Sequence, residues 1–193
     1  EIPKRDWSSD VCSSDLIRER LLHHSTLILQ NSVVLHHRQG VGGMAVQPGQ
    51  IFARELLSSS YFEVLDICFR EHDGFTLTIF TDAPNKNLTF SPLFGHLDSW
   101  KNLPGFDGDV IRVQANSLND IEQRWLTPCQ ILRGGNPLQT LANMTTSSVL
   151  ILSRSSFGYV AALLSRCSEV WMPNDFWHSP LPGWRTYDTD QPE

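Results

Sequence analysis

The sequence lacks a long apolar run, a basic stretch and closely spaced cysteines. No apolar segment approaches the roughly 20 residues that span a bilayer, and the first residues lack the apolar core of a signal peptide. Lysine and arginine number 15 against 21 acidic residues, a balance that argues against a nucleic-acid-binding surface. The four cysteines form no Cys-x-x-Cys pair, as is usual for reduced thiols in the cytoplasm. These absences predict a cytoplasmic protein with no transmembrane segment and no nucleic-acid partner.

Motifs of nucleophilic catalysis are also missing. The chain has no Gly-x-Ser-x-Gly sequence and no cysteine in a context that marks it as reactive. What is present is a chain of 193 residues, 40% hydrophobic and 19% charged, as is typical of folded proteins. This length suits one domain with its own core.

The N-terminal segment RDWSSDVCSSDL has neither helical nor strand periodicity and nearly repeats itself. It resembles the translation of a sequencing-library adapter, because GAC GTG TGC TCT TCC GAT CT encodes its last part. Segments of this kind are excluded from fold reasoning. We therefore expect residues 1–16 to be artefactual and disordered, residues 17–180 to form the domain and residues 181–193 to form a polar tail. An N-terminal domain of the same protein is expected to be missing.

Strands and helices alternate along the remaining sequence. Apolar or β-branched runs predict strands from about residue 32 to 36 and at 75–80, 110–114, 148–153 and 169–172. Helical spacing is present at 16–24, after the serine pair at 59–60, at 138–144 and after the serine pair at 155–156, with a short helix expected at 117–125. Such alternation predicts an α/β, Rossmann-like fold, in which a mostly parallel sheet has helices on both faces. Ligands of such sheets lie beyond the carboxyl ends of the strands.

Two segments that follow predicted strands are suited to anion binding. In HHRQG, Arg38 can bind a diphosphate through its planar fork, and Gly40 allows a ligand to approach the backbone. In RSSF, Ser155 and Ser156 stand at the start of a helix, where free N–H groups and the helix dipole favour an anion. A solvated strand end and an ordinary helix cap are the alternative interpretations of the two segments.

Two other patterns have a simpler explanation. GVGGMA, which begins at Gly40, matches the dinucleotide fingerprint G-x-G-x-x-A, but Pro48 interrupts the helix that should follow it. Asp107 and Asp109 flank a glycine before a predicted strand, which is typical of a tight turn rather than of a metal site. We therefore predict no metal ligands.

The HHRQG strand end and the SRSSFGY turn together resemble the GDP-fucose-dependent fucosyltransferases, and the segment VLILSRSSFGYVAALL resembles them most. These enzymes carry an H-x-R-R-x-D strand end and a serine-serine-phenylalanine turn in the second half of a two-domain GT-B fold. The resemblance covers roughly residues 32–177 and implies that residues 17–180 are the nucleotide-sugar-binding domain, one half of a GT-B fold. It implies inverting, metal-independent transfer of a sugar from a GDP-sugar, such as GDP-fucose, to a glycan acceptor, with no cofactor.

The resemblance also implies roles for individual residues. Arg38 would be the catalytic residue, which stabilises the charge that develops on the leaving diphosphate. Donor binding would involve His36, Gly40, Asp82, Arg154, Ser155, Ser156 and Phe157. Gln39 stands where the family has a second arginine, which favours a non-catalytic nucleotide-sugar-binding domain as one alternative. A nucleotide-binding or NAD-binding α/β domain of other chemistry is the second.

Overall fold

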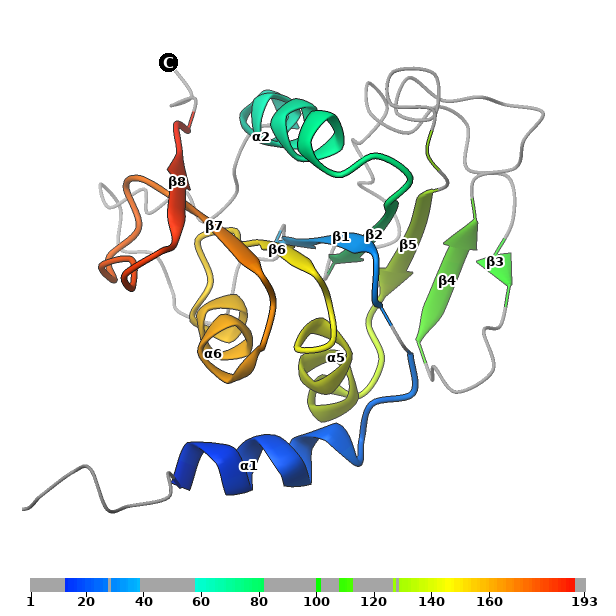
Figure 1. The fold of residues 1–193 in the computed structure, drawn as a ribbon. Helices are drawn as coiled ribbons and strands as arrows, with labels where there is room; N and C mark the ends of the chain where they lie inside the picture. The colour runs from blue at the N-terminus through cyan, green and yellow to red at the C-terminus, as the bar shows by residue number, and fades with distance from the viewer. Residues whose placement is uncertain are drawn as a thin grey trace, which may run out of the picture.

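The computed structural model describes residues 13–27, 29–38, 58–81, 100–101, 108–112, 127 and 129–189. Helices and strands alternate along this part of the chain (Figure 1). In chain order they are α1 Ser13–Leu22, β1 Ser32–His37, α2 Ser58–Glu71, β2 Thr76–Thr81, β3 Trp100–Lys101, β4 Asp109–Arg112, β5 Cys129–Arg133, α5 Pro137–Met144, β6 Val149–Ile151, α6 Ser156–Leu164, β7 Glu169–Pro173 and β8 Arg185–Tyr187.

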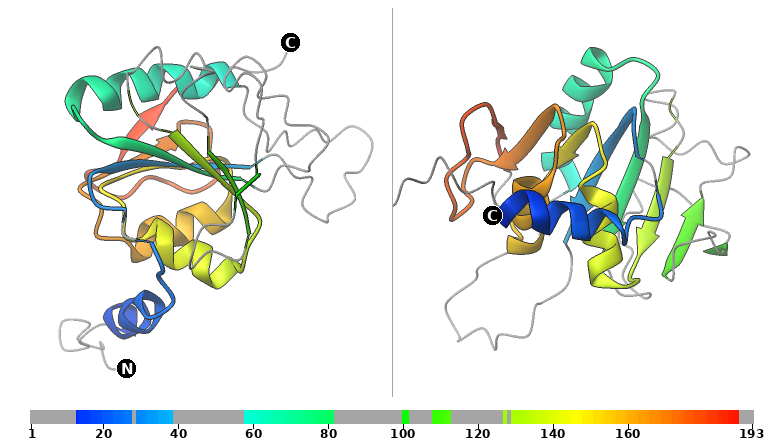
Figure 2. Two further views of the ribbon diagram at one scale, coloured as in Figure 1. Left: turned by 90° about the vertical axis from the view of Figure 1, so that its right-hand side faces the viewer. Right: turned by 60° about the horizontal axis from the view of Figure 1, so that its bottom comes forward.

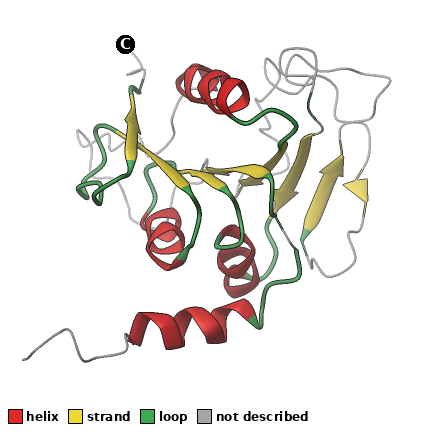
Figure 3. Cartoon of the chain, in the orientation of Figure 1, coloured by secondary structure: helices red, strands yellow, loops and turns green. Residues whose placement is uncertain are grey.

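The strands form one eight-stranded sheet in the order β3-β4-β5-β2-β1-β6-β7-β8. Six neighbouring strands of this sheet are parallel to one another: β5, β2, β1, β6, β7 and β8. At one side of the sheet, β4 is antiparallel to β5, and β3 is antiparallel to β4. Figure 3 shows the strands between helices that lie above and below them. The prediction of an α/β, Rossmann-like fold with a mostly parallel sheet is therefore confirmed.

Both faces of the sheet are covered by helices. Helix α2 lies on one face, while α5 and α6 lie on the other, with α1 packed on their outer side (Figures 1 and 2). Side chains alternate between the faces of a strand, so Val33 and Leu35 join the core beside α2, whereas Val34 joins the core beside α6. All six residues of β1 are buried, which makes this strand the centre of both cores.

The order of the parallel strands is that of doubly wound dinucleotide-binding domains. In chain order these strands are β1, β2, β5, β6, β7 and β8, so the sheet runs third, second, first, fourth, fifth, sixth. The order reverses between β1 and β6, which pair from Val33↔Val149 to Leu35↔Ile151. In open α/β sheets, ligands bind beyond the carboxyl ends of the strands at this reversal.

Three strands, β3, β5 and β8, lie where the sequence predicts none. β5 occupies a central position between β2 and β4, and β8 follows β7, although residues 169–172 form the last predicted strand. Helix α2 begins at Ser58, before the serine pair that was predicted to cap it. The predicted helix at residues 117–125 lies outside the described residues. Of the helices that the structure describes, none combines the length and the apolar character needed to cross a membrane.

The buried thiol of Cys68 is expected to make the fold sensitive to alkaline pH. Cys68 lies on α2 in the core of that face. Burial, with a smaller contribution from the Glu169 carboxylate, raises the pKa of this thiol from 9.0 to about 12. In the unfolded chain the thiol ionises near pH 9. The stability that depends on the neutral thiol is therefore present below pH 9 and is lost as the pH rises toward 12.

We expect the free energy of unfolding, measured by urea titration, to fall by on the order of 1 kcal/mol per pH unit above pH 9 because of this group. Cys68→Ala should reduce the slope with which the free energy of unfolding falls above pH 9. Cys167→Ala should reduce this slope less, because Cys167 is only half-buried, although burial raises the pKa of its thiol as well. Equal slopes in Cys68→Ala and wild-type protein would mean that the alkaline loss has another source.

Candidate functional site

The carboxyl ends of β1 and β6 meet at the edge where the strand order reverses. Arg38 directly follows β1, and residues 152–155 connect β6 to α6. Each of these two segments is predicted from its own residues to suit an anion, and the structure places both at the same edge of the sheet. This edge is therefore the candidate functional site.

His36 joins the two segments. Its side chain is buried, with 7% of the residue exposed, and its Nδ1 lies 3.2 Å from the Ser153 hydroxyl oxygen across a sequence separation of 117 residues. The His36 ring also packs against Phe157 in the first turn of α6, with the ring centroids 5.7 Å apart. One imidazole thus fixes the end of β1 relative to the turn that begins α6.

Gly158, which is not among the predicted site residues, allows this contact. A Cβ atom on Gly158 would lie 2.7 Å from Nδ1 of His36, closer than real Cβ atoms approach other atoms. Any larger residue would therefore push the His36 ring away from α6 or move the helix. A glycine inside an apolar helix is the only sequence signal that could have indicated a close approach.

The N-terminus of α6 faces the same edge. Ser155 is the N-cap residue, with φ −142° and ψ 124°, but its side chain makes no capping hydrogen bond. Ser155 is buried, Ser156 is exposed and Phe157 is half-buried. Because the cap side chain does not accept from the N–H groups of the first turn, these groups and the positive end of the helix dipole can serve an external anion.

Arg154 is held by the chain segments that follow β7 and β8. Its Nε donates to Oδ1 of Asp175 at 3.0 Å, its Nη2 pairs with Oδ2 of the same carboxylate, and Nη2 also donates to the Thr189 hydroxyl at 3.0 Å. The residue is 9% exposed. A donor-binding arginine is predicted at this position, and the structure gives Arg154 a structural role, since it ties the turn before α6 to two other segments.

A second buried histidine lies on the other side of β1. His37 is 2% exposed, its Nδ1 lies 3.2 Å from the Thr81 hydroxyl at the end of β2, and its ring meets the edge of Tyr61 on α2.

The Tyr187 hydroxyl donates to the carbonyl of Leu152, which follows β6. Burial raises the pKa of Tyr187 well above its ordinary value, so this hydroxyl remains a donor. These contacts tie the ends of neighbouring strands together around the candidate site.

The remaining predicted residues are only partly described. Arg38 is half-buried at the end of β1. Gly40, Asp82, the GVGGMA segment and Asp107 lie outside the described residues. Asp109 begins β4 and pairs in register with Arg133 at the end of β5, so it lies at the carboxyl edge of the sheet.

One group of potential metal ligands occurs among the described residues, and it lies elsewhere. Glu71, His72 and Glu169 bring one ligand atom each to within 4.8 Å of one another. Glu169 is the first residue of β7, so this group lies at the amino ends of the strands. This group is not predictable from the sequence, because no spacing pattern connects Glu71 and His72 to Glu169, almost 100 positions away.

The β1–β6 edge thus combines a buried imidazole, a helix N-terminus and an arginine that follows a strand. A combination of N–H groups, dipole and guanidinium suits an anionic ligand such as a phosphate. A scan against models of protein families, a search of curated proteins and a search of solved structures found no match to this chain.

Proposed function

We propose that the chain is the donor-binding half of an inverting glycosyltransferase that resembles the GDP-fucose-dependent fucosyltransferases. The donor, a nucleoside-diphosphate sugar such as GDP-fucose, binds at the carboxyl ends of β1 and β6. The observation that carries this proposal is the contact between His36 and Ser153, which joins the two segments of the resemblance at the reversal of strand order. A glycan acceptor binds to the part of the protein that this chain lacks.

The arrangement suggests a role for each group. Side chains of a strand alternate, so Arg38 follows His36 on the side of the sheet that α6 covers. Its guanidinium binds the β-phosphate, while Ser155, Ser156 and the first-turn N–H groups of α6 bind the remaining diphosphate oxygens. His36 contributes to the nucleoside end of the site. Arg154 keeps the turn in place through its ion pair with Asp175.

The reaction is a displacement at the anomeric carbon. An acceptor oxygen forms a bond to that carbon from the face opposite the diphosphate, and the bond from carbon to the β-phosphate oxygen breaks with its electron pair. Arg38 and the α6 N-terminus stabilise the negative charge that develops on the leaving diphosphate, which requires no metal ion. The proton of the acceptor goes to a base in the acceptor-binding part.

Replacing Arg38 with alanine tests the site. A ligand at 100 times its Kd stabilises a protein by about 2.7 kcal/mol, which raises the Tm of a domain of this size by a few degrees. We expect GDP and GDP-fucose to raise the Tm of the wild-type chain. Loss of hydrogen bonds between Arg38 and a phosphate should weaken GDP binding by a factor on the order of 10 to 100, so the shift at fixed ligand concentration should shrink or vanish.

Arg166→Ala is the matched control for the Arg38 variant. Arg166 is an exposed arginine just after the C-terminal end of α6, at the opposite end of this helix from the proposed anion site. Its replacement removes the same charge and should leave the shift with GDP unchanged. If both arginine variants respond to GDP as the wild type does, the diphosphate is not bound by Arg38 and the proposal is wrong.

The strand order favours a second candidate, a NAD-binding or nucleotide-binding domain of other chemistry, because dinucleotide-binding domains share it. In that case NAD should raise the Tm of both wild-type and Arg38→Ala protein, while GDP-fucose should not.

Gln39 favours a domain that binds the donor without catalysis. Donor hydrolysis or transfer by a version that includes the acceptor-binding part distinguishes the enzyme from such a domain.

A further inference from the structure

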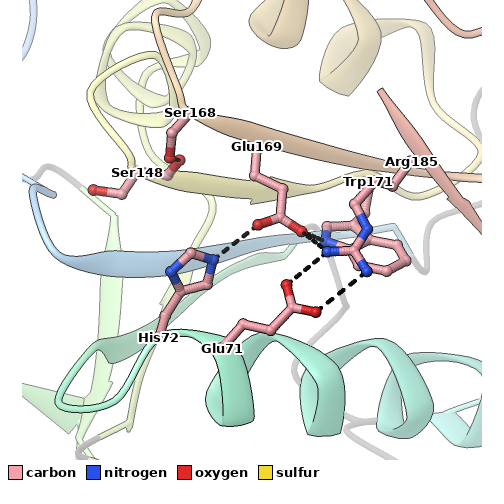
Figure 4. Close-up of polar contacts among 7 residues, drawn as sticks. All are labelled: Glu71, His72, Ser148, Ser168, Glu169, Trp171 and Arg185. Atoms are coloured by element: carbon pink, nitrogen blue, oxygen red, sulfur yellow. Dashed lines mark hydrogen bonds and ion pairs between the residues drawn. The ribbon is translucent and has the colours of Figure 1, made fainter. Parts of the chain in front are cut away.

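A polar cluster lies at the amino ends of β7 and β8, at the opposite edge of the sheet from the candidate donor site. It consists of Glu71 at the end of α2, His72 directly after it, Glu169 and Trp171 on β7, and Arg185 at the start of β8 (Figure 4). His72 Nε2 lies 2.8 Å from one oxygen of Glu169. The cluster therefore connects α2 to two strands of the sheet.

Arg185 lies between the two carboxylates. Its Nη1 donates to Glu71 at 2.7 Å and to Glu169 at 2.8 Å, and its guanidinium carbon lies 4.0 Å above the centre of the Trp171 ring (Figure 4). Trp171 Nε1 also donates to the same Glu169 oxygen that Arg185 contacts. The second Glu169 oxygen contacts His72. Glu169 therefore presents one oxygen to Arg185 and the other to the imidazole.

The charges of the cluster leave room for a cation. Two carboxylates and one guanidinium sum to −1 when the imidazole of His72 is neutral, so Arg185 alone does not balance Glu71 and Glu169. One histidine nitrogen and two carboxylate oxygens within 4.8 Å of one another are the ligand types of zinc and related divalent ions. Calcium and magnesium prefer oxygen ligands alone.

The geometry requires only small movements. Ligands about 2.0–2.1 Å from a tetrahedral zinc ion lie about 3.3 Å apart, so the pair His72–Glu169, now 2.8 Å apart, must open by about 0.5 Å. Glu71 must turn from Arg185 toward the imidazole, and its side chain is 45% exposed. Arg185 would then keep its contacts with Glu169 and the Trp171 ring.

We propose that Glu71, His72 and Glu169 bind a divalent cation of the zinc type, with water completing the coordination. The ion connects the end of α2 to the start of β7 and competes with Arg185 for Glu71. The alternative is a network of ion pairs around Arg185 that binds no metal. The two differ in the expected effect of Arg185: removal of this residue strengthens metal binding at the proposed site.

Titration calorimetry with zinc chloride on EDTA-treated protein, together with Tm measurements, tests this proposal. We expect zinc to bind wild-type protein at one saturable site in this cluster and to raise its Tm. His72→Gln and Glu71→Gln should each raise the Kd at least about tenfold, since even loss of an outer-shell partner of a metal ligand can have this effect. Glu71 is exposed, so its variant is expected to fold even if the His72 variant does not.

His23→Gln and Arg185→Gln complete the experiment. His23 is an exposed histidine after α1, and its replacement should leave the Kd unchanged if the metal binds the proposed cluster. Arg185→Gln should lower the Kd, because it removes the competing cation. A Kd that is the same in wild type, His72→Gln and Glu71→Gln would overturn the proposal, as would the absence of zinc binding by folded wild-type protein.

Discussion

Replacing Gly158 with alanine should both destabilise the protein and abolish binding at the β1–β6 edge. The added Cβ would lie 2.7 Å from Nδ1 of His36, and a second ring atom lies at 3.4 Å. His36 is buried and contacts Ser153, so its ring cannot turn into solvent without losing that contact. We expect a loss of about 1–3 kcal/mol in the free energy of unfolding, the usual cost of overpacking. GDP should no longer raise the Tm, because the strand end and the α6 turn would be forced apart.

A double-mutant cycle isolates the steric cause. Urea unfolding of Gly158→Ala, His36→Ala and the double variant should show that alanine at position 158 costs much less when the His36 ring is absent. The difference between Ser156→Gly and Ser156→Ala is the control, since it measures the same change from glycine to alanine at an exposed position of the same helical turn. If the cost of Gly158→Ala is the same with and without the ring, the contact between α6 and His36 is not its source.

The alternation of strands and helices was sufficient to predict the class of fold. The apolar runs that became β1, β2 and β6, and the helices α5 and α6, lie close to their predicted positions because the strands are apolar or β-branched runs and the helices have helical spacing. The cap of α5 is equally local, since the Asn136 side chain accepts from two N–H groups at the start of that helix. Local chemistry decides such features, so they can be predicted from one sequence.

The missed strands are those whose stability comes from their neighbours. β5 has only five residues and includes the polar Gln130, whose amide donates to the Thr78 hydroxyl on β2. β8 has three residues, too few to show a period, and it is held by pairing with β7 and by the Tyr187 hydroxyl. The sequence also does not state that β6 pairs with β1 rather than with β5, and that choice determines the strand order.

The candidate site was predictable in position but not in detail. The general rule for carboxyl ends of strands was enough to select His36, Arg38 and the turn at Ser155. The close approach of Gly158 depends on how α6 packs against β1. The ion pair between Arg154 and Asp175 and the cluster around Glu169 likewise depend on contacts between distant segments. Spacing along the chain contains no information of this kind.

Replacing Asn143 with alanine should cause a large loss of stability without removing any group from the proposed sites. Asn143 is fully buried at the end of α5. Its Oδ1 accepts from the N–H groups of Thr26 and Leu27, at 2.9 Å and 3.1 Å, and from the Ser25 hydroxyl at 3.2 Å. One side chain thus holds the segment that leads from α1 into β1. We expect a loss of about 2–4 kcal/mol in the free energy of unfolding, from unmade hydrogen bonds and the cavity left in the core.

Asn136→Ala, at the other end of the same helix, is the matched comparison. Asn136 is exposed and its side chain caps α5, so its replacement should cost about 1 kcal/mol. Both variants remove the same side-chain amide. The Asn143 amide is buried and connects α5 to the segment before β1, whereas the Asn136 amide is exposed and contacts only the start of α5. A clearly larger loss for Asn143→Ala in urea titrations would mean that α5 fixes the entry of the chain into β1. Equal losses would mean that the start of β1 is held by its pairing with β2 and β6 alone, and that the contacts of Asn143 add little to the position of His36 at the other end of the strand.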